Sequence, residues 1–184
     1  MNEIIRAIEE RNSTRGYTPE MLTEEEIKVI ENAALASPTA VNRQEWCFSL
    51  IGKEIIDELE KTQLALSLKD ADEETKKRLE SRGMKVLYNA PFMVVISADK
   101  NFGWSKVDAG IAVENIALAA QGLGLGSVII GCIGAIFQSE EKERFEKLLK
   151  FPEGYEFAVA IAIGHKATEK APHEKKPEKI VRLF

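Results

Sequence analysis

The chain has 184 residues, of which 45% are hydrophobic and 30% are charged, and its formal net charge is −5. These values are typical of a globular protein with a substantial core, and the length predicts one domain over residues 1–184. The acidic balance and the lack of a basic stripe exclude a broad nucleic-acid footprint, because such binding depends on neutralising many phosphates.

The sequence contains no pattern that predicts a metal site or a membrane segment. Cys47 and Cys132 lie in apolar, strand-like runs and are expected to be buried free thiols of a reducing compartment. The charged N-terminus does not have the pattern of a signal peptide, so we expect a cytoplasmic protein. The uncharged residues 115–139 are rich in glycine and are expected to form a helix, a turn and a buried strand, not a membrane span.

The first predicted element is a short amphipathic helix, "NEIIRAIEE", which ends at "RNSTR", residues 11–15. That stretch places two arginines, an amide and two hydroxyls in five consecutive positions. These donors suit a phosphate group. The alternative is a solvated turn in which the arginines complement the helix dipole, and that alternative needs no ligand.

The second predicted helix has a complete start signal. Thr23 and Glu26 have the spacing of a capping box, in which each side chain bonds the backbone of the other. The helix is expected to end at "SPTA", because the residue before Pro38 is disfavoured in helical conformation.

The loop after this helix, residues 37–46, contains two amide side chains, Asn42 and Gln44. Their spacing of two would point both in one direction on an extended backbone. Each amide donates and accepts hydrogen bonds, so the pair would suit the heterocyclic edge of a flat cofactor. Capping of the loop by the same two side chains is the alternative.

Four strands and four further helices are expected after this loop. The expected strands are 46–52, 90–99, 127–131 and 154–165. One expected helix begins near residue 53, two run from about 73 to 87 and from about 107 to 121, and the last begins at Ser139. The run at 90–99 is apolar on both faces and should be a central strand. The helix at 107–121 is apolar almost all round, which is typical of a core or subunit interface. A polar, proline-containing arm, about 166–184, ends this α+β domain.

The glycine-rich stretch "GLGLGSVIIG", residues 122–131, is not a dinucleotide-binding fingerprint. Ser127 occupies the third glycine position, and the loop leads from a helix into a strand, whereas the fingerprint leads from a strand into a helix. Gly122 could serve as a left-handed helix cap without any ligand.

Four segments, in the right order and at the right separations, resemble the FMN-dependent nitroreductase family. They are "ERNSTRGY", "AALASPTAVNRQEWCFSLI", "DAGIAVENIALAAQGLGLGSVIIG", and "IAIGH" with a lysine-rich, proline-containing tail. The resemblance covers nearly the whole chain and is least informative from about 64 to 87. It implies a mixed β-sheet flanked by helices, in an intertwined homodimer with exchanged C-terminal arms and two FMN sites at the subunit interface.

The resemblance also implies which residues bind the cofactor. The residues expected to meet the FMN phosphate, ribityl chain and pyrimidine edge are Arg11, Asn12, Ser13 and Arg15. Those expected beside the flavin ring are Pro38, Thr39, Ala40, Asn42, Gln44, Ile129, Ile130 and Gly131. In the arm, Lys175 would return to the phosphate, with His173 or Lys176 as helpers.

Four residues depart from those common in the family at the same positions. They are Asn12 in place of a basic residue, Glu45 in place of proline, Cys132 in place of glycine and His165 in place of tyrosine. These departures bear more on substrate preference than on flavin binding.

The function that the resemblance implies is a flavoprotein oxidoreductase. NAD(P)H would deliver hydride to FMN, leave, and be replaced by a small acceptor such as a nitroaromatic or a quinone, in a ping-pong mechanism. Because the flavin carries out the redox step, no catalytic acid, base or nucleophile is predicted. The alternatives are an FMN storage or redox-sensing protein, an offshoot doing dehalogenation, azoline oxidation or flavin fragmentation, and an interaction dimer that has lost its flavin.

Overall fold

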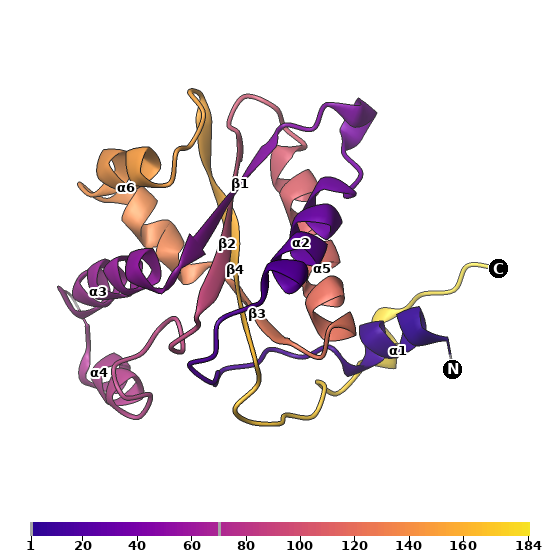
Figure 1. The fold of residues 1–184 in the computed structure, drawn as a ribbon, viewed down its shortest axis with the longest axis horizontal. Coiled ribbons are helices and arrows are strands. Elements are labelled where there is room, and N and C mark those ends of the chain that lie inside the picture. The colour runs from indigo at the N-terminus through magenta and orange to yellow at the C-terminus, as the bar shows by residue number, and fades with distance from the viewer. Residues whose placement is uncertain (1, 70) are drawn as a thin grey trace.

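The structure is a computed structural model that describes residues 2–69 and 71–184, and it places one β-sheet between two groups of helices (Figure 1). The strands are β1 (Trp46–Gly52), β2 (Phe92–Asp99), β3 (Gly126–Ile130) and β4 (Tyr155–Gly164), in the spatial order β1-β2-β4-β3. The helices are α1 (Glu3–Glu10), α2 (Glu24–Leu35), α3 (Lys53–Lys69), α4 (Glu73–Glu80), α5 (Ser105–Gly122) and α6 (Lys142–Leu148). The described residues also form the short 3₁₀ helices η1 (Ala40–Asn42), η2 (Cys132–Gln138) and η3 (Pro177–Lys179).

The three strand pairings among the described residues are all antiparallel. The expected mixed sheet is therefore wrong for this part of the chain, although the α+β class is confirmed. The reason is the order of the strands. β2 and β3, which α5 connects, run in the same direction and could pair in parallel, but β4 lies between them and pairs with each in the opposite direction. One parallel contact is an isolated bridge between Ser13, which lies outside the named strands, and Ser127 of β3.

The two faces of the sheet carry separate apolar clusters. On one face α2 and α5 pack against β2 and β4, and on the other face α3, η2 and α6 do so (Figure 1). Successive residues of β4 divide between them, since Ile161 faces the α5 side and Ala160 and Ala162 face the α3 side. β2 is buried up to Ala98, which confirms the expected central strand.

Local signals placed several elements correctly. β1 occupies the expected residues 46–52. The capping box of α2 is present, because the Thr23 hydroxyl accepts the Glu26 N–H at 3.2 Å and the Glu26 carboxylate accepts the Thr23 N–H at 2.7 Å. α5 lies in the core, one of the two places expected for its apolar sequence, and its residues Ala109, Ala112, Val113, Ile116 and Ala120 are all buried.

α4 ends at Glu80, earlier than the expected end near residue 87. Gly83 and Met84 have positive φ values of 61° and 56°, which breaks the helical path. The chain is then held by Glu60 of α3, a buried carboxylate that accepts the backbone N–H groups of Val86 and Leu87 at 2.9 and 2.8 Å. This contact between distant segments outweighs the local helical pattern.

The chain around residue 139 also differs from the prediction. The sixth helix begins at Lys142, not at Ser139, because residues 132–138 form η2 first. The Ser139 hydroxyl accepts the N–H of Glu141 at 3.1 Å and therefore shapes the turn before the helix.

The left-handed cap of α5 is Gly124, not Gly122, with a φ of +76°. The N–H of Gly124 donates to the carbonyl of Gln121 at 3.0 Å, and the N–H of Leu125 donates to that of Ala120 at 2.9 Å. This pair of bonds is a Schellman motif, which satisfies the last carbonyls of the helix.

Neither cysteine is fully buried, contrary to the prediction. Cys47 is half-buried in β1, where burial raises the pKa of its thiol, and Cys132 is exposed at the start of η2. Both are free thiols in the structure. Cys132 is exposed because η2 turns its first residue away from the apolar cluster that Ile133 and Ile136 enter.

The glycine-rich region 115–139 forms the end of α5, the Schellman turn, β3 and η2, as an interrupted pattern predicts. Across residues 2–69 and 71–184, no helix combines the length and the apolar character that crossing a membrane requires.

Candidate functional site

The N-terminal loop, residues 11–15, is fixed on the first residues of β3. The N–H of Thr14 donates to the carbonyl of Ser127 at 2.9 Å, and the Thr14 side chain is buried. A Cβ built on Gly126 would lie 2.6 Å from two atoms of the Thr14 side chain, so only glycine lets the loop approach this closely. The loop is therefore anchored on β3 by Thr14, and Arg11 and Arg15 lie on either side of this residue in the sequence.

We expect Gly126→Ala to lower the free energy of unfolding by roughly 1–3 kcal/mol, because a well-packed site must shift to accept a methyl group. Urea denaturation followed by circular dichroism measures the change. The matched control is Gly122→Ala, since a Cβ there meets no atom within 4 Å. A Gly126→Ala variant as stable as the parent chain would show that the loop is not held against β3.

Tyr17 connects the same loop to β4. Its buried hydroxyl lies 3.0 Å from the carbonyl oxygen of Thr14 and 3.2 Å from that of Ala162, and it donates to this pair. Burial raises the pKa of the Tyr17 hydroxyl, and nearby Tyr88 raises it further, against the opposing effect of Arg15. The hydroxyl is therefore a neutral donor throughout the physiological range.

The polar side chains of the loop have different partners. The Nε of Arg11 lies 3.2 Å from a carboxylate oxygen of Glu114 on α5. The amide of Asn12 donates to the carbonyls of Glu10 and Lys170, at 3.2 and 2.9 Å. Asn12 thus connects the loop to the start of the arm, and this contact uses its donors within the chain.

The opposite end of the loop carries Arg15, whose side chain is exposed. Its guanidinium carbon lies 5.9 Å from the centre of the Tyr88 ring, within the range of a cation–π contact. Ser13 is half-buried next to β3.

The C-terminal arm leaves β4 beside this loop. Lys166 forms an isolated bridge with Tyr17, and the N–H of Ala167 donates to the carbonyl of Gly16 at 3.0 Å. Beyond this point the arm runs past α1 and away from the sheet (Figure 1), with residues 167–184 all exposed. The Nζ of Lys175 lies 3.0 Å from a carboxylate oxygen of Glu9, and His173 and Lys176 are exposed nearby in sequence.

The loop at 38–44 is not extended, so the expected geometry of its two amides is wrong. It contains η1, and Val41, Asn42 and Gln44 have positive φ values of 48°, 56° and 54°. The amide nitrogen of Gln44 donates to the amide oxygen of Asn42 at 3.0 Å, and its backbone N–H donates to the hydroxyl of Thr39 at 2.9 Å. These bonds support the loop-capping alternative, while leaving further donors and acceptors of both amides on an exposed surface.

Sequence reasoning missed Asp108, which holds this loop from α5. Its two carboxylate oxygens lie 3.1 and 3.2 Å from the backbone nitrogen of Ala40. The signal in the sequence was an acidic residue in the first turn of a helix, but that signal alone predicts only dipole complementation.

The segment 129–131 ends β3 and enters η2. Ile130 is buried in the sheet, whereas Ile129 and Gly131 are exposed. Ile130 can therefore contribute to a surface site only through its backbone.

The predicted site residues fall into two groups within one chain. The N-terminal loop, the base of the arm and β3 lie together near the C-terminal end of α5 (Figure 1). The loop at 38–44 lies beside the N-terminal end of α5, through Asp108 (Figure 1). A single chain does not bring the two groups into one site.

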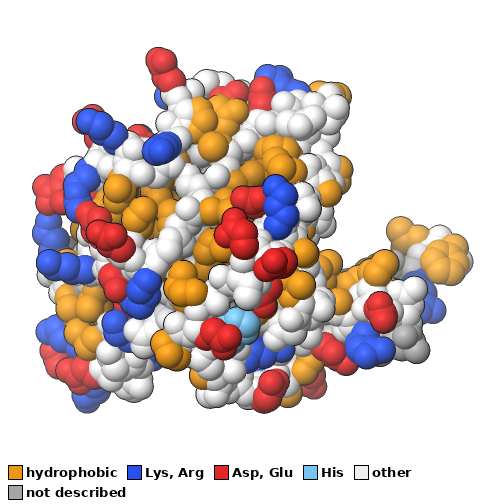
Figure 2. Space-filling view, in the orientation of Figure 1, with side chains coloured by type: hydrophobic (Ala, Val, Ile, Leu, Met, Phe, Trp, Pro, Cys, Tyr) orange, Lys and Arg blue, Asp and Glu red, His pale blue; other side chains and the backbone are white. Residues whose placement is uncertain are grey.

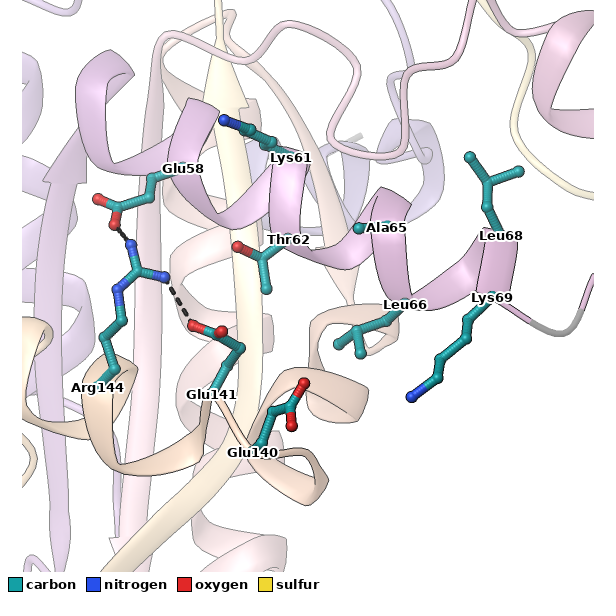
Figure 3. Close-up of a pocket in the computed structure, with 10 residues that line it drawn as sticks. All are labelled: Glu58, Lys61, Thr62, Ala65, Leu66, Leu68, Lys69, Glu140, Glu141 and Arg144. Atoms are coloured by element: carbon teal, nitrogen blue, oxygen red, sulfur yellow. Dashed lines mark hydrogen bonds and ion pairs between the residues drawn. The ribbon is translucent and has the colours of Figure 1, made fainter.

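A cavity of about 790 Å³ lies elsewhere, between α3 and the start of α6 (Figure 3). At one end of it, Arg144 of α6 pairs with Glu58 of α3 and lies 2.8 Å from Glu141. The residues that line it include none of those predicted to bind the cofactor.

The fold and the anchored, donor-rich loop define an α+β protein with a candidate anion-binding loop beside its sheet. A nitroreductase with bound FMN from Desulfitobacterium hafniense DCB-2 is 37% identical, with a TM-score of 0.95 and 100% coverage of both chains. A nitroreductase with bound FMN from Bacteroides fragilis NCTC 9343 is 25% identical, with a TM-score of 0.88 and 100% coverage of both chains. An FMN reductase [NAD(P)H] of Bacillus subtilis strain 168 is 26% identical over 98% of this chain and 73% of its own length.

The family itself is assigned by the match of the Nitroreductase family model to residues 8–165. The chain belongs to the nitroreductase family. The resemblance seen in the four sequence segments is thereby confirmed.

Proposed function

We propose that the chain is an FMN-dependent oxidoreductase that uses NAD(P)H. Its membership of the nitroreductase family and its similarity to FMN-bound nitroreductases and to an FMN reductase [NAD(P)H] support this function. The observation that carries the proposal is the loop at 11–15, which is held on β3 by buried Thr14 and presents cationic and hydroxyl donors on either side.

The donor set fits the phosphate of FMN. A phosphate monoester carries about −1.5 to −2 charges near neutral pH, and two arginines match that charge. Glu114 pairs with the Nε of Arg11. The described residues place no second ion pair on the terminal nitrogens of Arg11, whose N–H groups can donate to a phosphate. Ser13 and Arg15 would add donors from the same loop, and Lys175 would add a third cation.

The other predicted residues would hold the flavin ring. Exposed left-handed backbone and two amides at 38–44 suit the edge of a planar heterocycle, with Pro38, Thr39 and Ala40 against the ring. Ile129, Ile130 and Gly131 would meet the opposite side, Ile130 through its backbone alone. Bound FMN would supply the redox chemistry, taking hydride from NAD(P)H and passing it to a small acceptor in ping-pong order.

A homodimer would bring the two groups of site residues together. In this arrangement, the loop at 11–15 of one chain and the loop at 38–44 of the other form one site. Exposed apolar side chains on α1 and on the N-terminal half of α5 support such an interface, because apolar surface left exposed by a single chain is a feature of surfaces that bind a partner. They are Ile4, Ile5, Ile8, Val107 and Ile111.

The arm would be exchanged between the two chains. Its terminal apolar side chains, Ile180, Val181, Leu183 and Phe184, are 71% to 106% exposed, and Figure 2 shows hydrophobic side chains gathered on the projecting arm. β1 lies at one edge of the described sheet, next to an apolar groove of about 450 Å³ that Trp46, Phe48 and Leu50 help to line. An edge strand with unpaired backbone groups readily accepts an added strand, so the arm of one chain would pair with β1 of the other.

We expect the purified protein to be yellow and to release FMN, not FAD, on denaturation. The reason is that the predicted anion contacts fit one terminal phosphate. Chromatography of the released cofactor measures this, and a dominant FAD peak would contradict it. Stopped-flow absorbance with NADH or NADPH, then with a panel of nitroaromatics and quinones, tests turnover.

The same experiment separates the alternatives. Flavin that stays oxidised in the presence of both nicotinamides would favour storage or redox sensing. Reduced flavin that no nitroaromatic or quinone reoxidises would favour another flavin chemistry. A colourless protein that gains no colour with added FMN would overturn the proposed function.

A further inference from the structure

A buried carboxylate stands in the first turn of α5 without a cationic partner in the described residues. Asp108 is 3% exposed, and its carboxylate accepts its described hydrogen bonds from one group, the backbone N–H of Ala40. Burying a carboxylate is costly unless it is compensated, and here the positive end of the 18-residue helix and this N–H provide the compensation. Such an arrangement calls for a reason beyond stability, because an apolar residue would pack at lower cost.

The loop that Asp108 holds has an unfavourable backbone. Val41, the residue after Ala40, has φ 48° and ψ 28°, which is the left-handed region and a rare one for a β-branched side chain. Its side chain is 88% exposed, so side-chain packing does not stabilise this conformation. Residues in sparsely populated backbone regions persist where the surrounding structure holds them, and they cluster at functional sites.

Within the loop, the N–H of Arg43 donates to the carbonyl of Ala40 at 3.2 Å, but this bond does not connect the loop to α5. At the start of the loop the amide of Asn115 donates to the Ser37 hydroxyl at 3.1 Å, and at its end Arg43 stacks 4.2 Å from the centre of the Phe102 ring. Between these two points Asp108 is the described residue that ties the backbone to α5.

We propose that Asp108 is a positioning residue for the FMN site. Its carboxylate keeps the loop at 38–44 in the conformation that receives the flavin ring, and it does so without touching the cofactor. The inference rests on the proposed function, since it assigns the loop to flavin binding. When only a fraction of the protein has the binding conformation, the apparent dissociation constant rises by the inverse of that fraction.

The test is a titration of apoprotein with FMN, combined with hydrogen exchange measured by mass spectrometry on peptides that cover 38–44. Asp108→Ala is expected to raise the dissociation constant about 10-fold, in line with the loss of a hydrogen bond to a charged group, and to speed exchange in the loop. The matched control is Ser105→Ala, one turn earlier. Ser105 is also buried, and its hydroxyl has no hydrogen-bond partner among the described residues, so FMN affinity should not change.

A rescue experiment distinguishes positioning from a general structural role. Val41→Asn should recover most of the lost affinity in the Asp108→Ala background, because asparagine tolerates the left-handed conformation. The same substitution should have little effect while Asp108 is present, since the loop is then already held. A merely structural role for Asp108 predicts no such recovery.

Asp108→Asn keeps an oxygen that can accept the Ala40 N–H, so we expect a smaller loss of affinity and slower loop exchange than in the alanine variant. If Asp108→Ala does not fold, Asp108→Asn takes its place in the test. Affinity and loop exchange equal to those of the parent chain in the folded variants would overturn the inference. If the parent chain itself fails to bind FMN, the proposed function fails, while loop exchange in the apoprotein still reports whether Asp108 holds the loop.

Discussion

A chain that ends at Ala171 is expected to lose its dimeric state and most of its bound FMN together. The truncation removes the terminal apolar residues and Lys175, which the proposal places on the partner's sheet edge and near the phosphate. Burying the four apolar side chains at 180, 181, 183 and 184 would contribute about 1.5–3 kcal/mol each before the cost of ordering the arm. Light scattering gives the oligomeric state, and the ratio of flavin to protein absorbance gives the occupancy.

The full-length variant Lys175→Ala separates the two parts of this effect. It removes the cation but keeps the apolar end, so the protein should stay dimeric while its affinity for FMN falls. Lys175 pairs with Glu9 at 3.0 Å within the chain, which brings the arm's cation beside the helix that precedes the N-terminal loop. A truncated protein that remains dimeric and fully yellow would show that the arm serves neither purpose.

Arg11→Ala is expected to weaken FMN binding by about 10- to 100-fold. A hydrogen bond to a charged group contributes roughly 1.5–3 kcal/mol, which corresponds to that range. Lysine at position 11 should restore only part of the affinity, because it cannot reproduce the bidentate geometry of a guanidinium on a phosphate. Titration of apoprotein with FMN, followed by the quenching of flavin fluorescence, measures each dissociation constant.

The matched control is Arg6→Ala on α1, which removes one exposed positive charge a short distance along the chain. A general electrostatic effect would weaken binding in both variants, whereas a direct contact would weaken it only in the Arg11 variant. An unchanged dissociation constant in Arg11→Ala would return "RNSTR" to the solvated-turn interpretation.

Local patterns in the sequence were sufficient for most secondary structure. β1 and α2 lie where alternation and the capping box predict them, and β2 is central because its residues are apolar on both faces. These features depend on residues a few positions apart, so the sequence displays them directly. The family followed from four segments in order, and the match over residues 8–165 confirmed it.

The sequence by itself therefore determined the class, the family and most of the elements, whereas the tertiary structure decided how the candidate site is held. Three decisive contacts join residues far apart: Glu60 reaches Leu87, Arg11 reaches Glu114, and Asp108 reaches Ala40 across 68 positions. No periodicity predicts such contacts, because they depend on which elements the sheet order brings together. The antiparallel order, the early end of α4 and the left-handed loop at 41–44 all follow from long-range packing, which outweighs local preference where the two conflict.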